Sequence, residues 1–171
     1  MDITRPLHSQ DIQSFLLWMP NWIGDVVLTL PVIQSLRRAY PVARIFVVAK
    51  SPSYELLLGH PAIDTVLILP SGPEIGFWQK VGFARSLKKY RLDVGAVFPN
   101  SFGSAFLLSL TGAKCRLGYN TDARDILLTH PVTTTTHLKK TQYRVEYYFK
   151  IFSPLKMDAP DHKFASLNAQ E

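Results

Sequence analysis

Short apolar runs alternate along the chain with longer amphipathic stretches, and this alternation predicts the secondary structure. Runs rich in β-branched and other apolar residues are typical of buried strands. Stretches with apolar residues at helical spacing, ending in basic residues or glycine, are typical of helices. The strands are expected at 15–19, 43–49, 65–69, 93–98 and 114–117, with a candidate sixth at 132–135, and the helices at 26–40, 51–58, 77–90, 102–110 and 142–152.

This order of elements predicts an α/β fold, because apolar strands that alternate with helices form βαβ units with a parallel sheet and helices on both faces. Residues 1–13 are expected to be a flexible leader, 14–153 the folded domain and 154–171 the start of a linker or a tail. One feature leaves two readings open: Pro31 either kinks the first helix or stands at its first position.

The predicted fold indicates where chemistry should lie. Ligands of open parallel sheets bind outside the carboxyl ends of the strands. The loops at that edge are expected at 20–25, 50–53, 69–73, 99–101 and 119–124. Functional residues are therefore expected in these loops.

Asp25 is the informative carboxylate, since it follows the first strand and stands beside Gly24. A carboxylate in this place can act as a general base toward a hydroxyl group. It can equally serve only as a helix N-cap, for which Asp is among the preferred residues. Because Gly24 is alone in the loop, the glycine pattern of a dinucleotide-binding site is absent, and no pattern of metal ligands is present.

Six further residues at this edge are candidates for binding a substrate. Asn100 and Ser101 precede a predicted helix, where free N–H groups bind anions or hydroxyls, although Ser101 is also a typical cap. Lys50, Arg116 and Arg124 can bind phosphate or carboxylate groups or can be ordinary solvated charges. Trp22 can stack on a sugar or anchor its loop.

Composition narrows the class of protein further. The 171 residues are 47% hydrophobic and 19% charged, which is a globular balance, and the net charge of +6 favours an anionic partner. A single cysteine, Cys115, excludes an internal disulfide framework. The apolar runs are shorter than a membrane span and the first 14 residues lack a signal-peptide core, so a cytoplasmic location is expected.

Three motifs in this order resemble the ADP-heptose:lipopolysaccharide heptosyltransferases of glycosyltransferase family 9, particularly the heptosyltransferase II branch. The first motif is Asn21-Trp22-Ile23-Gly24-Asp25 with its continuation through Pro31 and Leu36–Pro41. The second is Pro99–Ala105, and the third is Arg116–Tyr119 followed by Arg124 and Leu127–Thr129. The resemblance covers residues 15 to 152.

The resemblance implies a GT-B glycosyltransferase, in which two Rossmann-like domains face each other across a cleft. This chain would be the N-terminal, acceptor-side domain, binding a Kdo–lipid A acceptor at the cytoplasmic face of the inner membrane. Asp25 would be the general base of an inverting transfer that needs no metal and no cofactor. Gly24, Trp22, Asn100, Ser101, Lys50, Arg116 and Arg124 would contact the acceptor.

Members of this family have about twice this length. The resemblance therefore implies an N-terminal fragment that is inactive alone, with the ADP-heptose site in an absent C-terminal domain. Two alternatives remain: a related glycosyltransferase with another nucleotide-sugar donor, and a non-catalytic module that binds an acceptor or a partner. Nucleic-acid binding has only the basic charge in its favour, because aromatic and basic residues do not interleave along a strand.

Overall fold

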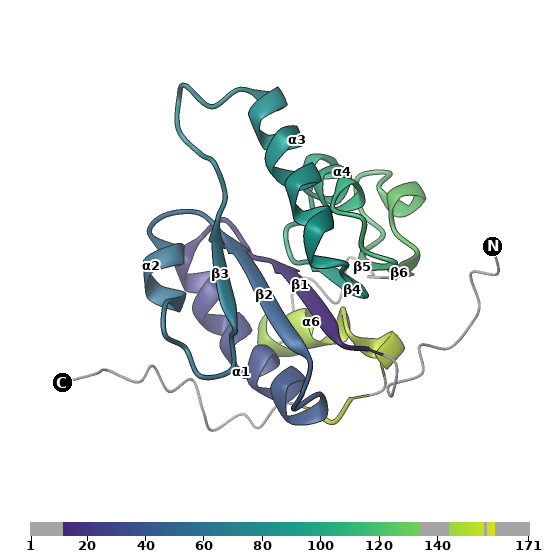
Figure 1. Cartoon of the computed structure of the whole chain (residues 1–171). Coiled ribbons are helices and arrows are strands. Elements are labelled where there is room, and N and C mark those ends of the chain that lie inside the picture. Colours follow the sequence, from purple (N-terminus) through teal and green to yellow (C-terminus); the bar gives the residue numbers. More distant parts are fainter. Residues whose placement is uncertain (1–11, 134–143, 156, 160–171) are drawn as a thin grey trace.

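The computed structural model describes residues 12–133, 144–155 and 157–159, which are built around a six-stranded parallel sheet (Figure 1). The strands are β1 (Ser14–Trp18), β2 (Arg44–Ala49), β3 (Thr65–Ile68), β4 (Val94–Val97), β5 (Cys115–Tyr119) and β6 (His130–Val132). The α-helices are α1 (Ile23–Ala39), α2 (Ser53–Leu57), α3 (Phe77–Ser86), α4 (Phe102–Leu110) and α6 (Arg144–Lys150). Short 3-10 helices are η2 (Leu87–Tyr90), η3 (Asp125–Leu127) and η4 (Ser153–Leu155).

The strand order is β3-β2-β1-β4-β5-β6, the arrangement of a Rossmann-type sheet. The chain first builds outward from β1 through β2 to β3, and then crosses back to place β4 on the other side of β1. The carboxyl ends of β1 and β4 therefore flank a topological switch point, where sheets of this kind bind ligands. The sequence predicted five candidate loops, and the strand order singles out the two that flank this point.

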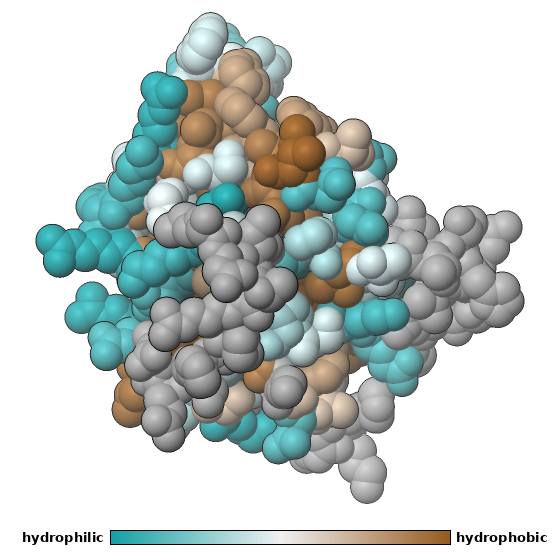
Figure 2. All heavy atoms as spheres, turned by 90° about the vertical axis from the view of Figure 1, so that its right-hand side faces the viewer, coloured by the Kyte–Doolittle hydropathy of each residue, from teal (hydrophilic) through white to brown (hydrophobic). Residues whose placement is uncertain are grey.

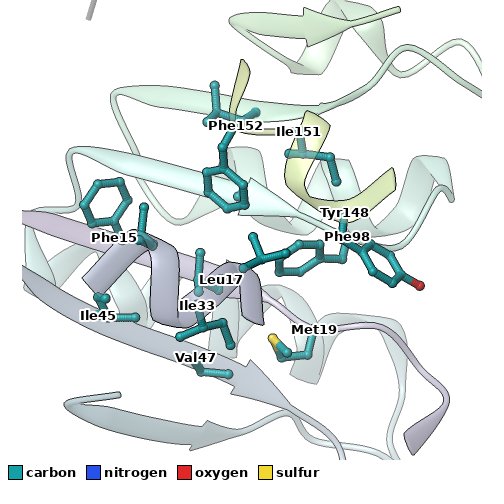
Figure 3. Close-up of a cluster of buried hydrophobic side chains, with 14 of the residues drawn as sticks. Phe15, Leu17, Met19, Ile33, Ile45, Val47, Phe98, Tyr148, Ile151 and Phe152 are labelled. Carbon is teal, nitrogen blue, oxygen red and sulfur yellow. The ribbon is translucent and has the colours of Figure 1, made fainter. Parts of the chain in front are cut away.

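The sheet is covered on both faces, as predicted. Along β1, Phe15 and Leu17 belong to the hydrophobic cluster with α1 and α6, whereas Leu16 and Trp18 belong to the cluster with α3 and α4. Side chains of a strand alternate between the two faces, so a continuous apolar run such as this one fits a strand that is buried on both sides. Figure 3 shows part of the first cluster, in which side chains from β1, β2, α1 and α6 meet.

Several boundaries differ from the sequence prediction. The sixth strand is His130–Val132 rather than 132–135, and it contains Pro131. Proline is tolerated there because β6 is an edge strand with one side free of ladder hydrogen bonds. Positions 134 and 135 lie outside the described residues. The predicted helix at 77–90 is α3 continued by η2, and residues 142–143 of the predicted last helix also lie outside the described part.

The reading that places Pro31 at the first position of the helix is wrong, since α1 begins at Ile23 and runs through Pro31, and a kink at Pro31 stays a prediction. The ends of the domain also reach further than expected. Ile12 is buried in the core and the Gln13 N–H donates to the Asp93 carboxylate at 3.0 Å, so these two residues belong to the folded domain rather than to a leader. Leu155 is likewise buried, beyond the predicted end at 153. Positions 1–11 and 160–171 lie outside the described residues.

Among the described helices, none is both long enough and apolar enough to cross a bilayer.

Candidate active site

A cleft of about 190 Å³ lies at the switch point of the sheet. Its walls come from the loop after β1 with the first turn of α1, the loop after β4, and α6. Four of the predicted site residues line it together, although they come from two distant parts of the sequence. They are Trp22, Asp25, Asn100 and Ser101.

Asp25 is the third residue of α1 and lines the cleft from the first turn of that helix. The N-cap of α1 is Trp22, and its side chain makes no capping hydrogen bond. The alternative that Asp25 is itself the N-cap is therefore wrong. A carboxylate in the first turn still interacts favourably with the positive end of the helix dipole, so its position has a structural benefit as well.

Tyr148 of α6 faces Asp25 across the cleft. Burial, and after it the charge of Asp25 and its hydrogen bond to the phenol, raise the pKa of Tyr148 far above the ordinary value. The phenol is thus protonated at neutral pH and can donate to the Asp25 carboxylate. Its ring packs edge to face against Phe98 at 5.4 Å, and Figure 3 shows the hydroxyl pointing away from the hydrophobic cluster. The packing fixes the direction in which the hydroxyl points.

Asn100 is held from two sides. Its amide Nδ2 donates to the Tyr147 hydroxyl at 2.7 Å, and its Oδ1 accepts from a guanidinium nitrogen of Arg124 at 3.2 Å. The Thr121 hydroxyl donates to the Asn100 carbonyl at 3.1 Å, and this hydrogen bond joins the loop after β5 to the loop after β4. These contacts fix the amide at the wall of the cleft.

Ser101 is the N-cap of α4, because its side chain accepts from the Ser104 N–H at 3.3 Å. The capping role that the sequence indicated is confirmed. Ser101 also lines the cleft, where its hydroxyl donates to the Ser104 hydroxyl at 3.1 Å, so a ligand hydroxyl would replace that contact.

Arg124 is fully buried and does not present its charge to the cleft. Its Nε donates to the Tyr119 carbonyl at 2.6 Å, and a terminal nitrogen donates to the Pro99 carbonyl. The turn before it uses two residues in the left-handed region, Asp122 at φ 54° and Ala123 at φ 53°, a conformation that costs energy for residues other than glycine. In this conformation Arg124 acts on the cleft through Asn100, not by direct contact with a ligand.

Arg116 and Lys50 lie outside the cleft. The Arg116 guanidinium donates to the carbonyls of Leu127 at 2.7 Å and Ala113 at 3.0 Å, which ties β5 to its neighbouring turns. Its hydrogen bonds serve the fold, contrary to the expectation of a free cation. Lys50 is half-buried at the carboxyl end of β2, on the same edge of the sheet as the cleft.

Trp22 is 77% exposed, so its ring is not an anchor of the loop. Gly24 precedes Asp25 in the first turn of α1, and a Cβ placed on it would meet no atom within 4 Å. The described chain itself therefore does not require glycine at this position. A glycine there leaves room for a ligand to approach the helix backbone.

Three cleft residues were missed by sequence reasoning, namely Arg144, Tyr147 and Tyr148 of α6. Their spacing of three and four residues places them on one side of a helix. The spacing alone does not show which part of the sheet that side of the helix contacts, because α6 packs against α1, which is distant in the sequence.

In the part of the chain that the structure describes, no group of three or more His, Cys, Asp or Glu residues is placed to hold a metal ion.

The family model "Glycosyltransferase family 9 (heptosyltransferase)" matches residues 81–170 of the chain. Lipopolysaccharide heptosyltransferase 2 of Escherichia coli (strain K12) is 34% identical over 112 residues, which are 64% of this chain and 32% of that relative. The matched residues thus span about a third of the length of the curated relatives.

Two solved structures have the same fold. E. coli ADP-heptose LPS heptosyltransferase II superposes with a TM-score of 0.69 at 25% identity, covering 81% of this chain and 39% of that chain. The family 9 glycosyl transferase of Veillonella parvula superposes with a TM-score of 0.76 at 18% identity, covering 90% and 44%. The predicted fold class is confirmed: the parallel sheet is that of a GT-B heptosyltransferase.

Proposed function

Because the chain belongs to glycosyltransferase family 9, the heptosyltransferases, we propose that it is the acceptor-binding half of an enzyme of lipopolysaccharide synthesis. The enzyme would transfer heptose from ADP-heptose to a Kdo- or heptose-bearing lipid A acceptor. The observation that carries this proposal is the position of Asp25, in a cleft at the switch point of the sheet and beside a tyrosine donor.

Asp25 is the proposed general base. Its carboxylate takes the proton of an acceptor hydroxyl while that oxygen forms the new bond to the anomeric carbon of the heptose. The bond from this carbon to the diphosphate breaks, ADP leaves with the electron pair, and the configuration inverts. Tyr148 is proposed to donate to this carboxylate, which would favour one orientation of the base.

The other cleft residues are proposed to bind the acceptor. Trp22 offers an exposed ring for stacking on a sugar, and Asn100 and Ser101 offer polar groups to its hydroxyls. Arg144 is the cationic side chain among the lining residues, and it suits the carboxylate of Kdo or a lipid A phosphate. Lys50 would extend this basic character along the same edge of the sheet.

The donor is proposed to bind mainly to a second, C-terminal domain, and transfer would then require both halves. Since its acceptor is anchored in a membrane, the enzyme is proposed to work in the cytoplasm at the surface of the inner membrane. The alternative of a non-catalytic acceptor-binding module shares the cleft and differs only in lacking turnover with a donor half.

Separate binding experiments on the 171-residue chain test this division of roles. We expect calorimetric titration with deacylated Kdo–lipid A oligosaccharide to show saturable binding, and ADP-heptose to bind at least tenfold more weakly. A mixture of both should show no robust turnover. Preferential binding of ADP-heptose, or rapid transfer by the chain alone, would contradict the proposal.

A further inference from the structure

Among the residues that the structure describes, an apolar surface is exposed on the side of the sheet formed by α3 and α4. It consists of Phe77 and Trp78 at the start of α3, Phe102 and Phe106 on α4, and Ile126 of η3, and is called here the aromatic surface. Trp78 is 78% exposed, Ile126 79%, Phe77 54% and Phe102 44%. Figure 2 shows hydrophobic side chains gathered in the upper half of the face that α4 borders.

The aromatic surface is continuous rather than a set of scattered residues. The Phe77 ring lies 5.5 Å from that of Trp78 and stacks on that of Phe106 at 5.9 Å. Phe102 precedes Phe106 by one helical turn on the same side of α4, and η3 packs against α4. Contiguous exposed apolar patches of this kind mark sites of association with a partner or a membrane.

The charge around the aromatic surface selects its partner. Between Ile75 and Leu92 there are five basic residues and no acidic one, namely Lys80, Arg85, Lys88, Lys89 and Arg91. Arg85 is exposed and follows Trp78 by two helical turns, so the ring and the cation share one side of α3. The acidic groups nearby are Glu74, which is exposed before the start of α3, Asp122 and Asp125 beside η3, and Asp93, which is paired with Lys114 at 2.8 Å.

Exposed aromatic side chains next to basic ones are typical of helices that lie in the interface of an anionic bilayer. The aromatic surface also adjoins the cleft, since Ser101 lines the cleft and Phe102 is the next residue. A bilayer on this surface would bring a membrane-anchored acceptor to the mouth of the cleft.

We propose that the aromatic surface, with the basic residues of α3 and η2, docks the protein onto an anionic lipid bilayer. This proposal rests on the membrane location given in the proposed function. It adds which surface contacts the membrane and which lipid charge that contact requires. The rings enter the interface and the cations meet the lipid phosphates. Lipids without net charge would bind weakly.

Vesicle co-sedimentation of the 171-residue chain tests the proposal, with zwitterionic phosphatidylcholine vesicles compared with vesicles containing about one third phosphatidylglycerol. We expect at least tenfold tighter binding to the anionic vesicles, weakened by salt. Trp78→Ala should lose about tenfold, and Arg85→Gln and Lys89→Gln about fivefold each. The matched controls are Val42→Ser, at a position 92% exposed, and Arg38→Gln, at an exposed position of α1 on the other face of the sheet. Both should bind within twofold of the wild type.

Fluorescence gives an independent reading of the same event. Trp78→Phe removes one indole, and the difference between its spectrum and that of the wild type should shift to the blue only with anionic vesicles. Absent or charge-independent binding of the wild type, or equal binding by Trp78→Ala, would overturn the proposal. So would a concentration-dependent dimer lost in Trp78→Ala, because the surface would then face a second copy. These vesicles contain no acceptor or donor, so the outcome does not depend on the proposed transferase activity.

Discussion

Replacing Arg124 by methionine tests whether this residue holds the fold or binds an anion directly. Methionine keeps the unbranched length of the side chain and removes the guanidinium. The change deletes the hydrogen bonds to the carbonyls of Tyr119 and Pro99 and to the Asn100 side chain. Two buried carbonyls thereby lose a charged donor.

The size of the effect follows from these contacts. A hydrogen bond from a charged donor contributes about 1.5–3 kcal/mol, so three of them amount to roughly 4–9 kcal/mol before any offset. Burial of the guanidinium opposes this and lowers the pKa of Arg124. Each acceptor left without its donor costs about 1–3 kcal/mol, so a net loss of about 3–5 kcal/mol is expected.

Urea unfolding followed by circular dichroism measures this loss. With a slope of about 2 kcal/mol per M, the midpoint should fall by about 1.5–2.5 M. Arg116→Met is the matched control, because Arg116 also donates to two carbonyls but is only half-buried, and its midpoint should fall by about 0.5 M. Where Arg124→Met is too unstable to purify, Arg124→Lys, which keeps the charge and a donor, should show a smaller shift.

Equal midpoints for Arg124→Met and Arg116→Met would refute the reasoning. If a stable Arg124→Met protein lost acceptor affinity while the NMR signal of the Asn100 side-chain amide stayed at its wild-type position, Arg124 would be the direct anion ligand that the sequence first indicated.

Three other changes test separate parts of the account. In a chimera joining this chain to the donor half of E. coli heptosyltransferase II, Asp25→Asn should lower kcat by about 10²–10⁴-fold with little change in acceptor KM, as steady-state assays would show. Gly95→Ala should cost about 1–3 kcal/mol in urea unfolding, because its Cβ would lie 2.7 Å from Leu108 Cδ1, whereas Gly24→Ala should not destabilise the protein. Burial raises the pKa of Asp93, but hydrogen bonds and the charge of Lys114 outweigh it and leave the pKa below its ordinary value. This stabilisation is present above the unfolded-state pKa near 4 and is lost as the pH falls through the folded-state pKa, so Asp93→Asn should destabilise the protein more at pH 7 than at pH 3.

The fold was largely predictable because its signals are local. The run Phe15–Met19 and the β-branched stretch of β2 read as buried strands, and their alternation with helices requires a parallel sheet. The order of the strands is not a local property. The sequence therefore offered five loops with equal weight, and only the crossover to β4 shows which two form the cleft.

The site was predictable where a residue stands in the loop or the first helical turn after a strand, as Asn100 and Asp25 do. The roles of the arginines could not be predicted, because an arginine that binds a ligand and one that donates to backbone carbonyls look the same in the sequence. Arg124 follows an unusual turn in which Asp122 and Ala123 have positive φ angles. Because this turn contains no glycine, the sequence does not indicate the conformation that buries Arg124. Tyr148 was missed for a different reason: its place depends on the packing of α6 against α1.

The central claim is that the cleft between the ends of β1 and β4 binds the acceptor. The most direct test is a titration of the isotope-labelled 171-residue chain with deacylated Kdo–lipid A oligosaccharide, followed by amide and indole NMR shifts. We predict saturable shifts of the Trp22 indole, the Asn100 side-chain amide and the Asp25 backbone amide, with no change at Val42. Shifts confined to the region of Arg116 or Lys50, or none at the cleft at saturating ligand, would contradict the account.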